Sequence, residues 1–172
     1  MRLIKYFFLV VVGVLCSCTK QNTENTAISS VKEIANVLVQ KKQIELNPLK
    51  GQWFYEQQPF NGYAVVYHEN DNLVEKIGFL NGKREGTYYR YFTDGAIKSE
   101  GYYVQNKLHG IKLNYFKNGN VFSESNYVNG QRHGLQKTWF LNGQLAKKKN
   151  LSKGREEGLQ QAWLANGKIY VN

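Results

Sequence analysis

Cysteine, proline and histidine are scarce in this chain of 172 residues, which has two Cys, two Pro and three His. Both cysteines lie within the first 18 residues, which excludes a disulfide framework and a Cys-rich zinc module. Two prolines exclude a collagen-like chain. Acidic residues are also few, because 13 Asp and Glu stand against 23 Lys and Arg for a net charge of +10. With 42% hydrophobic and 14% aromatic residues, the composition predicts a folded, basic domain.

The first residues have the pattern of an export signal. Arg2 and Lys5 precede an uninterrupted apolar run, Tyr6 to Leu15, which at about 1.5 Å per residue reaches only about half of a ~30 Å hydrocarbon core. Residues 1–17 are therefore predicted to be a signal peptide rather than a spanning helix. The order Leu15-Cys16-Ser17-Cys18 resembles the bacterial lipoprotein box, which implies cleavage before Cys18 and acylation of that residue. The alternative is an ordinary secretory signal with two incidental thiols.

Residues 18–30 are interpreted as the lipidated cysteine and a flexible tether, because Thr19 to Thr26 is polar throughout. Several acyl chains, such as palmitate, on Cys18 would anchor the protein to membrane lipid. In some bacterial lipoproteins an acidic cluster after this cysteine resembles a surface-export signal, and Glu24 is the single acid between Thr19 and Thr26. We therefore expect a lipid anchor in the cell envelope, at the outer membrane and facing the periplasm.

A repeat of 24 residues dominates the remainder. Each unit begins at a glycine, has an aromatic residue five positions later, and has Asn-Gly or Asp-Gly in most units eight and nine positions later. The glycines are Gly62, Gly86, Gly110, Gly134 and Gly158. A degenerate unit from Leu38 to Asn61 is expected to precede them. We divide the chain into 1–17, 18–30, a cap with the degenerate unit at 31–61, and the array at 62–172.

Each unit is predicted to be a β-hairpin. Asn-Gly between alternating runs favours a type I′ turn, which needs positive φ at both central residues. Positions one, three and five after the glycine are mostly apolar, whereas positions two and four are mostly polar. Strand periodicity therefore predicts that the first set is buried and the second lies largely in water. Because one hairpin cannot bury its own face, the units are expected to stack into an elongated, all-β antiparallel meander.

The units GTYYRYFTDGAIKSEGYYVQNKLH and GIKLNYFKNGNVFSESNYVNGQRH resemble MORN repeats, in the variant found in bacterial lipoproteins and antitoxin-type proteins. The resemblance covers Gly62 to Asn172 well and Leu38 to Asn61 weakly. It implies an extended, twisted sheet used for scaffolding or contact, and brings no catalytic residues. Asn70-Asp71-Asn72 and Gln105-Asn106 depart from the pattern, so looser turns are expected there.

The segment before the array allows two interpretations. Ser30 to Glu33 fits a capping box, and the apolar residues that follow have helical spacing, which predicts a helix from Val31 to about Leu38 that gives way to strand. Repeat phasing instead makes Val39 to Ile44 a strand. In either form the segment could cover the first sheet edge, which would otherwise invite pairing with other chains.

Two aromatic rows are candidate interaction surfaces. They are expected on opposite faces and contain Tyr67, Tyr91, Tyr115, Trp139 and Trp163 in the first row, and Phe92, Phe116 and Phe140, with Leu164, in the second. The plainer interpretation is that these rings form the core of a thin sheet. A thin sheet with aromatic residues on both faces cannot hide both without a partner or strong twist, which indicates an interaction surface.

Basic residues concentrate late in the chain, and candidate anion contacts are Lys147, Lys148, Lys149, Lys153 and Arg155. A solvated charged face is the simple interpretation. The export signal argues against nucleic acid as partner, so anionic lipid or acidic polysaccharide is the expected counter-charge.

The histidines show no catalytic or metal-binding arrangement. His109 and His133 occupy the same repeat position, where Glu85 and Glu157 stand in other units, and His68 stands alone. We therefore expect no enzyme, no cofactor and no metal. The predicted function is a lipid-anchored, noncatalytic envelope scaffold that binds a protein partner. The alternatives are a module that binds envelope polysaccharide or anionic lipid, and an antitoxin-like inhibitor of a partner protein.

Overall fold

The computed structural model describes residues 33–170. The expected signal peptide, the lipidated Cys18 and the tether lie outside the described residues. Within the described part of the chain, no helix has the length and apolar character needed to span a bilayer.

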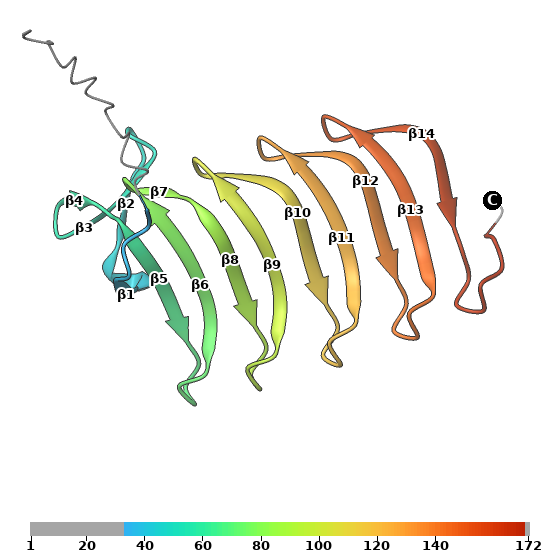
Figure 1. The fold of residues 1–172 in the computed structure, drawn as a ribbon, viewed down its shortest axis with the longest axis horizontal. Helices are drawn as coiled ribbons and strands as arrows, with labels where there is room; N and C mark the ends of the chain where they lie inside the picture. The colour runs from blue at the N-terminus through green and yellow to red at the C-terminus, as the bar shows by residue number, and fades with distance from the viewer. Residues whose placement is uncertain (1–32, 171–172) are drawn as a thin grey trace, which may run out of the picture. The chain divides into compact units, whose positions relative to one another are not determined.

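The fold is all-β, as the repeat pattern predicts (Figure 1). The N-terminal strands are β1 (Leu38–Gln40), β2 (Glu45–Asn47), β3 (Gln52–Tyr55) and β4 (Gln58–Pro59). The array contains β5 (Gly62–Tyr67), β6 (Leu73–Leu80), β7 (Lys83–Arg84), β8 (Gly86–Tyr91), β9 (Ile97–Val104), β10 (Lys107–Tyr115), β11 (Val121–Val128), β12 (Gln131–Trp139), β13 (Leu145–Ser152) and β14 (Arg155–Ala162).

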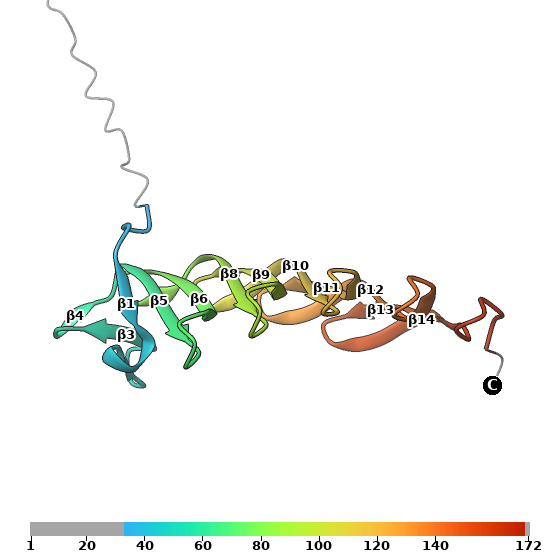
Figure 2. The same ribbon diagram turned by 90° about the horizontal axis from the view of Figure 1, so that it is seen from below.

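The array strands pair in chain order. From β9 to β14 each strand is antiparallel to the strand before it, so the predicted meander of hairpins is confirmed. Seen from below, β8 to β14 form one layer (Figure 2). Because the sheet is a single layer, each of its two faces is exposed to solvent unless another segment of the chain covers it.

The turns that join successive units have type I′ character, which the sequence predicted for the turns inside the units. Both central residues have positive φ in Asn81-Gly82, Asn129-Gly130 and Lys153-Gly154. Gln105-Asn106 keeps the same conformation without glycine, at φ 47° and 70°. The Asn106 side chain accepts a hydrogen bond from the Arg84 backbone at 2.8 Å and donates one to the Gly51 carbonyl at 2.8 Å, which holds this turn in place.

The turns inside each unit differ from the prediction. At Thr93-Asp94-Gly95 only the glycine has positive φ, and the Phe92 carbonyl accepts a hydrogen bond from the Gly95 amide. This is a three-residue loop with glycine at its left-handed position rather than a type I′ turn. The first unit keeps this loop with Asp71 in place of glycine, at φ 61°. Asn70-Asp71-Asn72 and Gln105-Asn106 therefore depart from the repeat pattern in sequence, but their backbone turns keep the conformation of the corresponding turns in other units.

The predicted helix from Val31 to Leu38 is wrong over the residues that the structure describes, because 33–37 are not helical. Instead β1 pairs with β5 in parallel, which covers the first edge of the array. A short 3₁₀ helix, Lys41–Gln43, follows β1 in place of the alternative strand Val39 to Ile44.

The expected degenerate unit, Leu38 to Asn61, is met only in part. Strands β2, β3 and β4 form a separate three-stranded sheet and do not extend the array. The turn between β3 and β4, Glu56-Gln57, has positive φ at both residues, like the turns between later units. The Phe60 carbonyl accepts a hydrogen bond from the Gly82 amide at 2.7 Å. At the equivalent positions of a later unit, the Arg132 carbonyl accepts a hydrogen bond from the Gly154 amide.

The prediction of which strand face is buried is also wrong. Ala64, Tyr88 and Gln136, from the set expected in water, are at least 95% buried, whereas Ile111 from the other set is 54% exposed. We name the side of the sheet that carries Ala64, Tyr88 and Gln136 the groove face, and the other side the opposite face. Cross-strand register joins Ala64 to Ile77 and Tyr88 to Gly101 on the groove face.

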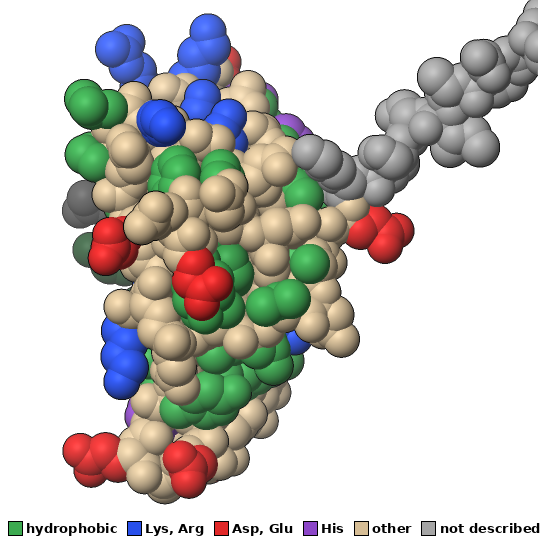
Figure 3. All heavy atoms as spheres, turned by 90° about the vertical axis from the view of Figure 1, so that its left-hand side faces the viewer, with side chains coloured by type: hydrophobic (Ala, Val, Ile, Leu, Met, Phe, Trp, Pro, Cys, Tyr) green, Lys and Arg blue, Asp and Glu red, His purple; other side chains and the backbone are tan. Residues whose placement is uncertain are grey.

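The reason is that the segment before the array covers the groove face of its first strands. Val39, Ile44 and Phe60 pack with Ala64, Ile77, Phe79 and Tyr88 in one core cluster, and Trp53 packs against it. Phe79 is fully buried there. We call residues 38–60 the cap. Its outer side keeps exposed apolar side chains, among them Leu38, Leu46 and Leu49, and Figure 3 shows apolar side chains on this end of the molecule.

Candidate functional site

Beyond the cap, the groove face changes from apolar to polar along the same rows of the sheet. One row runs from Ala64 and Ile77 through Tyr88 and Gly101 to Lys112, Ser125, Gln136 and Lys149. A second row contains Glu75, Arg90, Ser99, Asn114, Ser123, Thr138 and Lys147. Because the cap does not reach these later strands, their side chains line an open, polar surface.

A groove of about 510 Å³ lies on this surface. Seven Lys and Arg line it and no Asp or Glu does. The cations are Arg90, Lys98, Lys112, Arg132, Lys137, Lys147 and Lys149, and the other lining residues are Ser99, Ser123, Ser125, Thr138, Asn114, Gln136, Tyr115 and Phe122. Such a groove has a positive potential that attracts anions.

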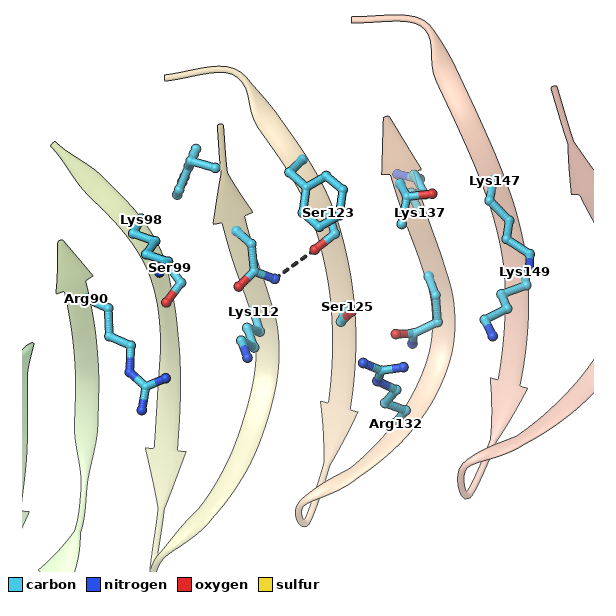
Figure 4. Close-up of a pocket in the computed structure, with 15 residues that line it drawn as sticks. Arg90, Lys98, Ser99, Lys112, Ser123, Ser125, Arg132, Lys137, Lys147 and Lys149 are labelled. Carbon is cyan, nitrogen blue, oxygen red and sulfur yellow. Dashed lines mark hydrogen bonds between the residues drawn. The ribbon is translucent and has the colours of Figure 1, made fainter. Parts of the chain in front are cut away.

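The groove cations form two groups on either side of a neutral floor (Figure 4). Arg90, Lys98 and Lys112 come from β8, β9 and β10, whereas Arg132, Lys147 and Lys149 come from β12 and β13. Ser123 and Ser125 on β11 lie between the two groups (Figure 4). Lys137 also lines the groove, but its ammonium contacts the Glu124 carboxylate at 3.1 Å, and its register partners Glu124 and Lys148 belong to the opposite face.

Two lining residues are placed by β-bulges that recur in the array. Arg90 pairs with Ser99 and Tyr91 with Ile97, so Lys98 is the extra residue between them. One unit later the same irregularity makes Phe122 the extra residue. A bulge redirects a side chain that strict alternation would send to the other face. Sequence alternation alone therefore could not assign Lys98 and Phe122 to the groove.

Gln136 forms part of the groove lining with a fixed amide. Its Nε2 donates to the backbone carbonyls of Asn126 at 3.1 Å, Gly134 at 3.2 Å and His133 at 3.4 Å. Because the reversed amide would place oxygen against three carbonyl oxygens, these contacts determine the orientation. The buried Oε1 accepts no hydrogen bond from the described residues. It is therefore a free acceptor at the groove floor.

Glu75 marks the boundary between the cap and the groove. Its buried carboxylate accepts hydrogen bonds from Lys41 at 2.5 Å and from Arg90 at 2.7 Å. Burial acts to raise the pKa of Glu75, but the two cations outweigh it and hold that pKa below its usual value. The ionised carboxylate thus joins the cap to Arg90 at the end of the groove.

The first aromatic row has contacts on the opposite face for at least three members, although Tyr115 also contributes to the groove lining. Tyr91 packs against Tyr89, the Lys137 ammonium lies over the Trp139 ring at 5.9 Å, and the Tyr115 hydroxyl donates to Glu100 at 2.5 Å. Burial, followed by this contact with Glu100, raises the pKa of Tyr115 to about 12. Tyr67 is exposed, and Trp163 is half-buried beside β14. Among the described residues, no aromatic ring pair joins successive members of this row, so they do not form a continuous stack.

The second row begins the turns inside the units, where Phe92, Phe116, Phe140 and Leu164 each close a loop by backbone hydrogen bonds. Phe116 packs edge-on against Phe122, and Lys98 lies over the Phe92 ring at 5.7 Å. Since Phe122 and Lys98 line the groove, the Phe116 and Phe92 rings that they contact lie on the groove side of the sheet.

The structure divides the predicted lysine cluster. Lys147 and Lys149 line the groove, whereas Lys148, between them, pairs in register with Lys137 and Gln161 on the opposite face. Lys153 lies in a turn and Arg155 begins β14, and neither lines the groove. Sequence analysis missed Arg90, Lys98 and Lys112, although repeat phase places Arg90 in line with Asn114 and Thr138.

The three histidines do not meet. His68 follows β5, and His109 and His133 lie on β10 and β12. Within residues 33–170, no group of three or more His, Cys, Asp or Glu side chains is arranged to hold a metal ion.

Comparison with known families matches three segments, 84–105, 108–129 and 132–152, to the MORN repeat variant. These segments cover all six strands that line the groove, apart from the first residue of β10 and of β12, and repeats of this kind suggest a repeat-based binding or scaffold module. No curated protein matches the chain.

Two solved structures are similar over parts of their length. One is a mutant of S. aureus TarM in complex with Fondaparinux, alpha-GlcNAc-glycerol and UDP, at 16% identity and TM-score 0.36, covering 67% of this chain and 21% of that chain. The other is accessory secretory protein 1, 2 and 3 of Streptococcus pneumoniae, at 16% identity and TM-score 0.34, covering 77% of this chain and 23% of that chain. This chain therefore spans less than a quarter of either.

Proposed function

We propose that this chain is a noncatalytic binding scaffold of the cell envelope, whose groove face holds an acidic partner. The observation that supports the proposal is the groove lining, which has seven cations and no carboxylate. Lys98, Lys112 and Lys147 form no ion pair among the described residues, so their charges remain available to a ligand. Arg90 and Lys137 are paired with Glu75 and Glu124, and Lys149 is paired with Glu156 at 2.9 Å, a contact that a ligand of Lys149 would share or displace. A repeat sheet that offers one charged face over several units suits an elongated partner better than a small one.

The proposal is tested by capture of solubilised envelope components on the immobilised full chain. Charge-driven binding weakens steeply as salt rises, whereas an apolar interface does not. We expect acidic components to be retained at low salt, released at high salt, and lost from the Lys147→Gln, Lys149→Gln double variant. Lys148→Gln is the matched control, because this lysine lies on the same strand but on the opposite face. Equal retention by the double variant and the wild type would contradict the proposal.

A protein partner on the opposite face is the second candidate. Three apolar side chains there are notably exposed, namely Tyr102, Ile111 and Leu159, at 45%, 54% and 79%. Exposed apolar side chains favour a protein interface that tolerates salt. A protein that is retained at high salt and lost from Ile111→Ser with Leu159→Ser would establish this scaffold role, and an antitoxin-like inhibitor would bind its target in the same way.

The membrane anchor is part of the proposal. It is supported by the order Leu15-Cys16-Ser17-Cys18, which resembles the lipoprotein box, and it would place the sheet in the envelope, at the outer membrane and facing the periplasm. Metabolic labelling with palmitate should be lost from Cys18→Ser and kept in Cys16→Ser. Labelling that persists in Cys18→Ser would contradict the anchor without affecting the groove.

A further inference from the structure

We infer that the ligand of the groove is a linear acidic glycan, which lies across strands β8 to β13 with charged groups held at both ends and sugar hydroxyls on the floor between them. The inference rests on the proposed function and names the chemical class of the ligand. Four features of the groove carry it.

The first feature is the separation of the cations. Lys112 on β10 and Lys149 on β13 stand in the same row, three strand spacings apart, which is about 14 Å. An isolated phosphate or carboxylate cannot contact both. A polymer that crosses the strands can place one anionic group at each end.

The second feature is the neutral floor. Between the two cation groups the row residues are Asn114, Ser123, Ser125 and Thr138, which carry hydroxyl and amide groups and no charge. The Asn114 amide donates to the Ser123 hydroxyl at 2.7 Å (Figure 4). These groups can donate to and accept from sugar hydroxyls. A chain charged at every unit, such as polyphosphate, would instead place charge on a floor without cations.

The third feature is the free acceptor of Gln136. Its Oε1 needs a donor, which a sugar hydroxyl supplies and a phosphate diester or a carboxylate does not. Gln136 is 95% buried in the absence of ligand, so a ligand reaches its Oε1 only when side chains beside it, such as that of its register partner Lys149, move aside.

The fourth feature is Phe122, an aromatic ring that is 45% exposed within this charged groove. Its edge contact with Phe116, at 5.1 Å between ring centroids, fixes its position. The C–H face of a pyranose is apolar and can pack on such a ring, whereas an inorganic polyanion gains nothing from it.

The test is a calorimetric titration of the full chain in detergent with three probes of matched length. The probes are a hyaluronan oligosaccharide, in which a neutral N-acetylglucosamine separates successive glucuronate carboxylates, long enough to cross six strands, roughly 24 Å, a neutral maltooligosaccharide, and inorganic polyphosphate. We expect the hyaluronan oligosaccharide to bind at least roughly tenfold more tightly than the other two. The Lys147→Gln, Lys149→Gln double variant should weaken it by roughly fivefold or more, and Lys148→Gln should leave it unchanged.

Phe122→Leu separates the glycan from other anions. This variant keeps an apolar contact with Phe116, so we expect weaker binding of the hyaluronan oligosaccharide and unchanged binding of polyphosphate. Tighter binding of polyphosphate, or of phosphatidylglycerol vesicles, through Lys147 and Lys149 would overturn the inference and leave the proposed function standing. If no acidic probe bound in a way that depends on these lysines, the proposed function would fail as well.

Discussion

The Nε of Arg90 donates a hydrogen bond of 2.7 Å to Oε2 of Glu75, across the neighbouring strands β8 and β6. Lys41, from the cap, binds the other oxygen of the same carboxylate. This three-residue contact lies where the groove face changes from covered to open. It therefore connects the packing of the cap with the position of a groove cation.

Replacing Glu75 with Gln should lower the free energy of unfolding by about 1 to 3 kcal/mol, because the buried group loses two charge-assisted hydrogen bonds. Chemical denaturation measures the change. Glu124→Gln is the control, since its pair with Lys137 is more exposed and should contribute less than about 1 kcal/mol. Equal losses in the two variants would contradict the special role of Glu75.

The same carboxylate predicts a pH dependence. The pKa of Glu75 in the folded chain lies below the ordinary value of 4.5, so its contribution is fully present above that value and is lost as pH falls through the folded pKa. Wild-type stability should therefore fall more steeply below about pH 4.5 than that of Glu75→Gln. Parallel acid-unfolding curves for the two proteins would argue against this contribution.

Truncation of the side chain at one repeat position should destabilise the fold far more under the cap than at the equivalent position of a later unit. Phe79 is fully buried under the cap, whereas Tyr127, at the same position two units later, is only half-buried. Phe79→Ala is expected to cost about 3 to 5 kcal/mol of unfolding free energy through a cavity. Tyr127→Ala should cost clearly less, and similar losses would show that the cap adds little.

At the left-handed position of the three-residue loops, replacing glycine should lower stability and introducing glycine should raise it. Gly119 has φ 85° and open space around the position of a Cβ, so Gly119→Ala should cost about 1 to 2 kcal/mol through backbone strain alone. Asp71 holds the corresponding position at φ 61°, and Asp71→Gly should stabilise by a few tenths to about 1 kcal/mol. Thermal unfolding of both variants checks the signs, and destabilisation by Asp71→Gly would be contrary to the argument.

Tyr115 should ionise late in an alkaline titration followed by tyrosinate absorbance. Its pKa is raised to about 12 by burial and then by the hydrogen bond to Glu100, and Tyr115→Phe identifies its transition. Glu100→Gln should move that transition down but keep it above the ordinary value of 10, because burial remains. The raised pKa favours the neutral form, so its stabilising contribution should disappear as pH rises through 10 to 12. A transition near 10 in the wild type would exclude the contact.

The sequence allowed the array to be predicted, because period, alternation and turn residues act locally. The turns inside the units were assigned incorrectly since Asn-Gly suits both a type I′ turn and the left-handed position of a three-residue loop. The covered face could not be identified because the cap that covers Ala64 and Phe79 does not follow the repeat. Lys147 and Lys149 were found by their clustering, whereas Arg90 and Lys112 reach the groove through register between distant units.

The groove takes its lining from six strands that are each hydrogen-bonded only to their immediate neighbours. In a one-layer sheet no second layer restrains the twist between adjacent strands, so small changes of twist add up along β8 to β13. The distance between the two cation groups therefore changes as the sheet twists or untwists along β8 to β13. A rigid ligand that contacts both groups would fix this distance. It would thereby restrict the twisting of strands that it does not touch.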